Sequence, residues 1–212
     1  MNRLLEDLLK RYPALEVCGD AIEAAGERMV RTYRGGGKLL VCGNGGSCAD
    51  SDHIVGELMK GFLSRRPMRE TEKEQFRLAL GADAEDLIAK LQRGLPAISL
   101  PAQGAVLSAF ANDVDAELVY AQLVYGYGNA RDLFLGISTS GNSRNVLAAA
   151  KTAKALGLFT LALTGEKASR LSEVCDLTVR VPATETYQVQ ELHLPVYHYL
   201  CAYTERQTET DG

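Results

Sequence analysis

The sequence has no tryptophan, no long apolar run and no excess of positive charge, and it contains few cysteines and histidines. Because no stretch approaches the roughly 18 consecutive apolar residues that a membrane-spanning helix needs, we expect no membrane partner. The formal net charge of −4 argues against a broad nucleic-acid-binding surface. The N-terminus is charged and amphipathic and lacks the apolar core of a signal peptide, which favours a cytoplasmic location.

The five cysteines are odd in number, scattered along the chain and never spaced as CxxC. This pattern favours reduced thiols over disulfides. There are only three histidines, His53, His193 and His198, so any chemistry that depends on histidine must use one of them.

Short apolar segments alternate with helical segments along most of the 212 residues. This alternation predicts an α/β fold with a parallel sheet, helices on both faces and right-handed crossovers. The length is that of one domain, which we place at 1–212. The predicted strands cover 38–42, 96–100, 133–137, 159–164 and 177–181.

Two segments lie outside this alternation. Residues 1–34 carry apolar side chains at helical spacing on both sides of Pro13, which predicts two N-terminal helices that pack on the sheet or on another subunit. Residues 63–96 begin with a charged stretch and end with a helical segment, so we expect a variable, exposed flap. The helix before this flap is expected to end near Phe62. The remaining predicted helices cover 14–33, 84–93, 105–112, 116–127, 144–156, 171–174 and 186–206.

The first predicted strand leads into Gly43-Asn44-Gly45-Gly46-Ser47 and then into a helix. Glycines permit the positive φ and the close backbone approach that such a turn needs. The N–H groups of the turn and of the helix N-terminus form an anion site. The glycine spacing is not GxGxxG, and no acidic residue ends the next strand, so a dinucleotide cofactor is disfavoured.

The third predicted strand leads into Ser138-Thr139-Ser140-Gly141-Asn142-Ser143, again before a helix. Hydroxyls and free N–H groups at a helix N-terminus suit a phosphate. The loop lacks the GK[ST] ending of a Walker loop, and a Ser-rich capping turn is the structural alternative. Both loops follow parallel strands, at the sheet edge where ligands bind, which favours the functional interpretation.

His53 and Glu57 lie four residues apart on one helix and therefore share a face. Gln190, His193 and His198 lie on one broad face of the last helix. Histidine, glutamate and glutamine side chains could together hold Zn²⁺ or a similar ion. They could equally act as acid/base groups around a sugar carbonyl, and His53 with Glu57 could simply be a surface pair.

Asn112 and Asp113 interrupt a predicted helix after the second strand. A polar turn that ends the helix is one interpretation. The other is a pair that hydrogen-bonds substrate hydroxyls.

Five motifs occur in order along the chain: GNGGS, a D-x-x-H-x-x-x-E helix (Asp50, His53, Glu57), FANDV, GISTSGNSRNV and VQELHLPVYHYLC. Together they resemble the sugar isomerase (SIS) domain, and more narrowly the phosphoheptose isomerase family. The resemblance covers about residues 14 to 205.

This resemblance implies a three-layer αβα sandwich with a flavodoxin-like sheet, assembled as a homotetramer or homodimer with sites at subunit interfaces. It implies isomerisation of sedoheptulose 7-phosphate to D-glycero-D-manno-heptose 7-phosphate through an enediol(ate), with Glu57 and His198 as the catalytic proton-transfer groups. It also implies one Zn²⁺ per subunit, held by His53, Glu57, Gln190 and His198. The residues that it places against the phosphosugar are Asn44, Gly45, Gly46, Ser47, Glu57, Asn112, Asp113, Ser138, Thr139, Ser140, Ser143 and Gln190.

The sequence departs from the family pattern at three places. Gly61 stands where the family has an arginine, with Lys60 one position earlier; residues 101–104 read PAQG rather than TTDT; and the flap 63–96 is longer. The first two changes remove expected substrate contacts, so an isomerase of a different phosphosugar is one alternative. A non-catalytic SIS module that binds a phosphosugar or a protein, of the replication-initiator-associating type, is another. The complete His/Glu/Gln/His set favours an enzyme.

Overall fold

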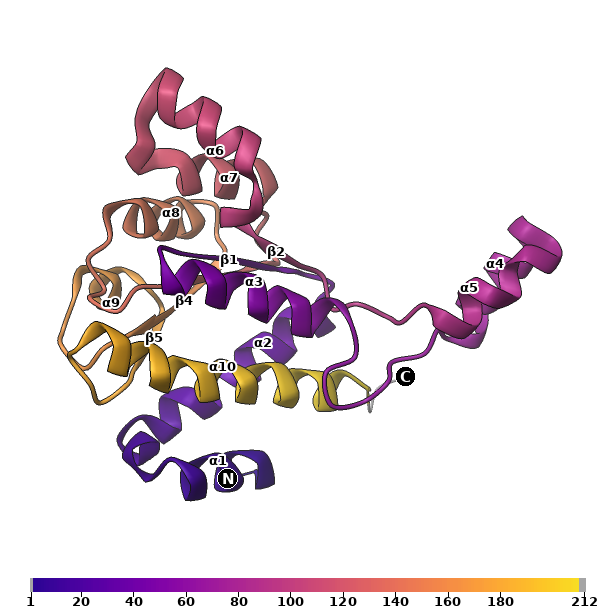
Figure 1. Ribbon diagram of the computed structural model, residues 1–212, viewed down its shortest axis with the longest axis horizontal. Helices are drawn as coiled ribbons and strands as arrows, with labels where there is room; N and C mark the ends of the chain where they lie inside the picture. Colours follow the sequence, from indigo (N-terminus) through magenta and orange to yellow (C-terminus); the bar gives the residue numbers. More distant parts are fainter. Residues whose placement is uncertain (1, 210–212) are drawn as a thin grey trace.

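The computed structural model describes residues 2–209, so the ends of the predicted domain 1–212 lie outside the described residues. A five-stranded parallel sheet forms its centre, with helices on both faces (Figure 1). The strand order β2-β1-β3-β4-β5 is that of flavodoxin-like sheets, and the predicted three-layer fold is confirmed. The strands are β1 (Leu39–Gly43), β2 (Ala97–Ser99), β3 (Leu133–Ile137), β4 (Phe159–Thr164) and β5 (Leu177–Arg180).

The sheet has two hydrophobic cores because alternate residues of each strand point to opposite faces. In β1, Leu39 and Val41 contribute to one core, and Leu40 and Cys42 to the other. The second core is covered by α7 (Val119–Tyr127), α8 (Arg144–Ala155) and α9 (Arg170–Val174). The first core is covered by α1 (Arg3–Arg11), η1 (Pro13–Cys18), α2 (Gly19–Arg34), α3 (Gly46–Met59) and α10 (Thr186–Glu209).

The N-terminal helices pack on the first core of their own chain, through buried side chains that include Leu5, Leu8 and Leu15. The second predicted helix was placed too early. It is preceded by the 3₁₀ turn η1, in which the Leu15 N–H bonds to the Tyr12 carbonyl at 2.9 Å. Proline at the first position suits this tight turn because it has no N–H to donate.

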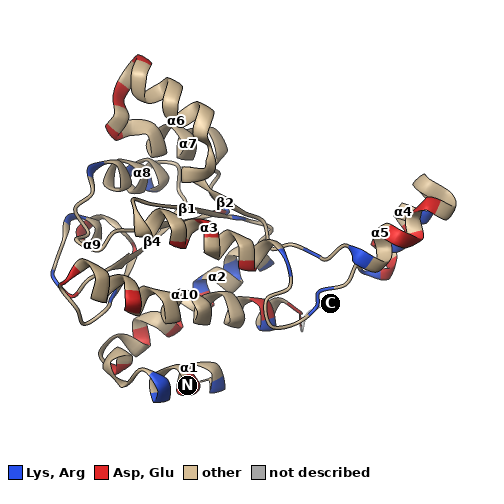
Figure 2. Cartoon of the chain, viewed as in Figure 1, with Lys and Arg blue, Asp and Glu red and all other residues tan. Residues whose placement is uncertain are grey.

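The flap predicted at 63–96 is an exposed helical arm that stands off from the body (Figure 1). It contains α4 (Glu70–Leu80), η2 (Gly81–Asp83) and α5 (Ala84–Lys90), and α4 has no buried residue. Figure 2 shows acidic and basic residues interspersed along it. From Glu70 on, the charged stretch forms a helix that local contacts support: Lys73 bonds to Glu70 at 2.5 Å, and the Arg69 N–H donates to Glu72 at 2.7 Å.

A second excursion connects β2 to α7. After η3 (Leu100–Ala102) it runs through α6 (Gly104–Phe110), the π-helical turn η4 (Ala111–Asp115) and the 3₁₀ turn η5 (Ala116–Leu118). Asn112 and Asp113 lie in η4, so the helix widens at this pair rather than ending there. Within residues 2–209, no helix combines the length and the apolar character that crossing a membrane would require.

Candidate active site

The two Gly/Ser loops meet at the carboxyl ends of neighbouring strands, β1 and β3. The chain leaves β1 toward β2 on one side and leaves β3 toward β4 on the other, so this is the topological switch point of the sheet. The side chains of Asn44 and Asn145 tie the loops together through two reciprocal hydrogen bonds of 2.9 Å. The predicted convergence of the loops is therefore confirmed.

The GNGGS loop needs its glycines for two reasons. Gly45 has a φ of 56°, which favours glycine. A Cβ atom at Gly46 would lie 2.5 Å from Nε2 of Gln190, so glycine is what lets this α10 side chain reach the loop backbone. Tyr120 of α7 holds the loop from the other side, with its hydroxyl 3.0 Å from the Gly43 carbonyl oxygen. Ser47 is buried at the start of α3.

The STSGNS loop is a compact, polar turn at the N-terminus of α8. The hydroxyls of Ser138 and Ser143 lie 3.0 Å apart, while Ser140 is exposed and Thr139 half-buried. Gly141 has a φ of 64°, and Ser169 occupies the space that a Cβ atom would need. The loop therefore offers hydroxyls and helix N–H groups to an anion on a fixed backbone.

A second group of polar residues lies farther along α3 and α10. The two helices run side by side (Figure 1), which brings His53 and Glu57 to His198. His53 Nε2 lies 3.2 Å from Glu57 Oε1, and the imidazole rings of His53 and His198 lie 5.0 Å apart in an edge-on arrangement. The Glu57 side chain is 15% exposed and that of His53 42%, so the group is open to a ligand.

The surroundings favour an ionised Glu57 and a neutral His198. Burial alone would raise the pKa of Glu57. The hydrogen bond and the charge of Lys60, 2.9 Å away, together with His53, outweigh burial and lower the pKa. Burial, and then the neighbouring His53, lower the pKa of His198. Gly61 stands where the family has an arginine and carries no charge, but Lys60 supplies a positive charge beside Glu57.

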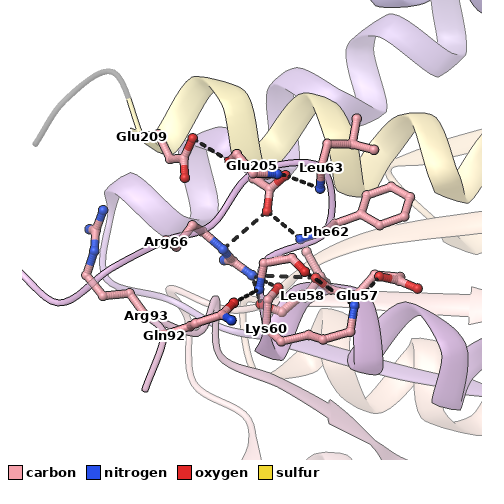
Figure 3. Close-up of polar contacts among 12 residues, drawn as sticks. Glu57, Leu58, Lys60, Phe62, Leu63, Arg66, Gln92, Arg93, Glu205 and Glu209 are labelled. Carbon is pink, nitrogen blue, oxygen red and sulfur yellow. Dashed lines mark hydrogen bonds and ion pairs between the residues drawn. The ribbon is translucent and has the colours of Figure 1, made fainter. Parts of the chain in front are cut away.

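The C-terminal end of α3 is held by a buried ion pair that pattern analysis missed (Figure 3). Arg66 Nε lies 3.3 Å from Glu205 Oε1, and the two side chains are each 3% exposed. The Arg66 guanidinium donates to the carbonyls of Leu58 and Lys60. These contacts satisfy carbonyls that the helix leaves unpaired, which explains why α3 ends at Met59 rather than at the predicted Phe62.

The four predicted zinc ligands do not converge within one chain. Gln190 contacts Gly46, whereas His198 lies eight residues later on α10, about 12 Å farther along the helix at 1.5 Å per residue. Among residues 2–209, no three His, Cys, Asp or Glu side chains gather closely enough to hold a metal ion. The residues of a single chain therefore do not fit a four-ligand zinc site.

The position of His193 on the last helix had suggested that it lies on the same face as His198. The structure places the two histidines in different environments. His193 is fully buried, and its Nε2 lies 3.3 Å from the Thr164 carbonyl oxygen. Burial lowers the pKa of His193 to about 4. His193 therefore packs against β4, to which Thr164 belongs.

Asn112 and Asp113 stand apart from both groups. Their side chains are exposed and bond to each other, with Asn112 Nδ2 2.8 Å from Asp113 Oδ1. Their predicted contact with substrate stays a prediction.

Several residues of the site carried no signal that pattern analysis could use. Tyr120 lies in an apolar helical run, and Tyr197 reads as a core residue. Asn145 follows the STSGNS loop by two positions, so the loop could have been extended to include it. Contacts between elements place all three in the site.

Comparison with known proteins agrees with this arrangement. SIS domain models match residues 5–75 and 107–202. A phosphoheptose isomerase from Roseiflexus sp. (strain RS-1) is 37% identical over 192 residues, which cover 91% of this chain and 84% of that protein. The structure of a phosphoheptose isomerase from Francisella tularensis matches with a TM-score of 0.76 and 29% identity, over 95% of this chain and 94% of that one. A Neisseria gonorrhoeae phosphoheptose isomerase has a TM-score of 0.74, 27% identity and the same coverage. The chain therefore belongs to the SIS domain family, in the group of the phosphoheptose isomerases.

Proposed function

We propose that this protein interconverts sedoheptulose 7-phosphate and D-glycero-D-manno-heptose 7-phosphate. The observation that best supports this proposal is the solvent-accessible cluster formed by Glu57, His53 and His198. The chain also has relatives that are phosphoheptose isomerases. A module that only binds a phosphosugar has no need for an ionised carboxylate beside a neutral imidazole, so this group favours catalysis. We also propose a cytoplasmic location, where the five cysteines, none of which forms a disulfide within residues 2–209, would stay reduced.

The reaction moves one proton between C1 and C2 and one between the two oxygens. The lowered pKa of Glu57 keeps its carboxylate ionised, so it takes the C1 proton of the ketose. The electron pair of that C–H bond forms the enediolate, and Glu57 returns the proton to C2. Neutral His198 passes the proton between O1 and O2. The STSGNS loop binds the phosphate, and Asn44 and its neighbours position the sugar.

The spacing of the two polar groups favours an assembled enzyme. Gly46 lies in the loop that Asn44 ties to the phosphate loop, and Glu57 follows it by eleven residues, about 16 Å along α3 at 1.5 Å per residue. In an extended heptose 7-phosphate, seven bonds separate C2 and eight bonds separate C1 from the phosphorus, which puts the reacting carbons about 9 to 10 Å from it. We therefore infer a homotetramer or homodimer in which the phosphate loop of one copy faces Glu57 of another. A monomer in light scattering would contradict this.

The same assembly would bring Gln190 of one copy to His53, Glu57 and His198 of another, and on this ground we propose one Zn²⁺ per chain. These are nitrogen and oxygen ligands of the kind that zinc prefers, and a bound ion would act as a Lewis acid. Plasma emission spectrometry of the purified protein is expected to find about one zinc per chain, and less than a tenth of that in Gln190→Ala. Protein that folds and assembles without zinc in a zinc-supplemented buffer would overturn this assignment.

Solvent exchange tests the reaction before the product is characterised. Sedoheptulose 7-phosphate in D₂O with the protein is expected to gain deuterium at C1 and to yield the aldose, as followed by proton NMR. Pentulose and hexulose phosphates, run in parallel, test the alternative substrates. If none of these sugars exchanges, the protein is a binding module rather than an isomerase.

A further inference from the structure

A cleft of about 620 Å³ lies at the base of the exposed arm, and we call it the arm cleft. A volume of this size is typical of pockets that hold small molecules. Gly37 and Pro96, which precede β1 and β2, line it together with residues from both ends of the arm and from the end of α10. The arm cleft therefore lies at the amino ends of the strands, whereas the two Gly/Ser loops lie at their carboxyl ends.

The lining of the arm cleft is rich in arginine. Its charged members are four arginines and two glutamates: Arg34, Arg66, Arg69, Arg93, Glu72 and Glu209. Even when Glu205 is added, which pairs with Arg66 from behind, the positive charges outnumber the negative ones. Arginine presents a planar set of donors that matches the oxygens of a phosphate or carboxylate. The composition of the arm cleft therefore indicates an anionic ligand.

Contacts within the chain hold Arg93 in place. Its backbone N–H donates to the Arg66 carbonyl oxygen at 2.7 Å, which lays the two connectors of the arm side by side (Figure 3). Its Nε donates to the Pro67 carbonyl oxygen at 3.0 Å, whereas neither terminal nitrogen makes a hydrogen bond within residues 2–209. A guanidinium that is anchored through Nε and keeps both terminal nitrogens unpaired is preorganised to bind two oxygens of one anion.

The two glutamates restrict what the rest of the ligand can be. An ionised carboxylate accepts hydrogen bonds and donates none, so Glu72 and Glu209 suit hydroxyl groups and repel a phosphate. Each uses only Oε2 in the hydrogen bonds that it makes within residues 2–209, with the Arg69 N–H and the Ser64 hydroxyl. Inorganic phosphate would also leave most of the cleft unfilled. A ligand that combines a phosphate with hydroxyl groups fits both halves of the lining.

We propose that the arm cleft binds a phosphate monoester that carries hydroxyl groups, a sugar phosphate or a nucleotide, with Arg69 and Arg93 on the phosphate. Arg69 directly precedes α4, and Arg93 follows α5. A ligand held by both therefore links the two ends of the arm to the body of the protein. This site is separate from the candidate active site, and the inference does not depend on the proposed function.

Hydrogen–deuterium exchange of the full-length protein, followed by mass spectrometry, tests the site and its location. Wild type is incubated in phosphate-free buffer with ribose 5-phosphate or AMP, and in parallel with ribose or adenosine, which lack the phosphate. The two phosphate esters are expected to slow exchange at 66–72 and 93–96, and the two uncharged compounds are not. Binding at the STSGNS loop is read separately, as slower exchange at 138–143.

Variants of the lining test the assigned residues. Arg69→Gln and Arg93→Gln should each raise the Kd, measured from the dependence of protection at 93–96 on ligand concentration, by about tenfold or more, because each removes charge-assisted hydrogen bonds. Arg65→Gln is the matched control: it removes the same charge from the same connector, but Arg65 does not line the arm cleft. Its Kd should stay within about twofold of wild type, and circular dichroism checks that every variant folds.

The two ligands also distinguish the source of the phosphate. Equal Kd values for ribose 5-phosphate and AMP would assign the site to sugar phosphates, and a lower Kd for AMP would assign it to nucleotides. Protection confined to 138–143, or equal protection by AMP and adenosine, would overturn the proposal. So would an Arg65→Gln variant that loses binding as much as Arg69→Gln and Arg93→Gln do, because the effect would then follow net charge rather than the cleft.

Discussion

Glu57→Gln is expected to lower kcat by about 10²- to 10⁴-fold while the protein stays folded, because the amide cannot accept the C1 proton. The amide oxygen can still accept from Lys60, which lies 2.9 Å from the carboxylate, so the shape of the site should persist. His198→Ala is expected to cause a loss of the same order by removing proton transfer between the two oxygens. Both are measured as kcat for sedoheptulose 7-phosphate, with circular dichroism as the test of folding.

Glu70→Gln is the matched control for this experiment. Glu70 and Lys73 form the same i, i+3 pair as Glu57 and Lys60, but on the exposed arm. This control is expected to keep the turnover of wild type. Unchanged turnover in both Glu57→Gln and His198→Ala would show that the proton-transfer groups are elsewhere.

Glu205→Gln is expected to lower the free energy of unfolding by about 3 to 5 kcal/mol, the cost of breaking a buried ion pair from one side. Glu205 accepts from the backbone N–H groups of Phe62, Leu63 and Ser64 at 2.7, 2.7 and 3.1 Å, besides pairing with Arg66 (Figure 3). A glutamine would point its NH₂ group at one of these donors and remove the charge that pairs with Arg66. Urea denaturation followed by circular dichroism measures the change.

Glu209→Gln provides the comparison one turn later on the same helix. Within residues 2–209, the Glu209 side chain accepts one hydrogen bond, from the Ser64 hydroxyl at 2.7 Å, so its loss should cost about 1 kcal/mol. If Glu205→Gln and Glu209→Gln lower the free energy of unfolding equally, the Arg66–Glu205 pair does not hold α3 and the arm in place.

The prediction of elements succeeded where the signal is local. The strands at 133–137 and 159–164 were placed at their observed bounds, because apolar runs flanked by glycine and polar turns are typical of buried parallel strands. The start of α8 at Arg144 was also predicted, directly after the serine-rich loop whose last residue, Ser143, is the N-cap. Element ends set by distant partners were wrong: α3 ends at Met59 because Arg66 and Glu205 meet there.

The sequence by itself determined the α/β fold and the placement of the two Gly/Ser loops at the carboxyl ends of strands, because these depend on local periodicity and turn chemistry. The proton-transfer roles of Glu57 and His198 are implied by the family resemblance. Tertiary structure alone decided which of these residues meet. The side-by-side course of α3 and α10 places Gln190 at Gly46 and His198 at His53, and so separates ligands that the sequence had grouped. It also joins Asp50 to Tyr197 across 147 positions of chain, a contact with no local signature because it exists only once both helices have packed on the same face of the sheet.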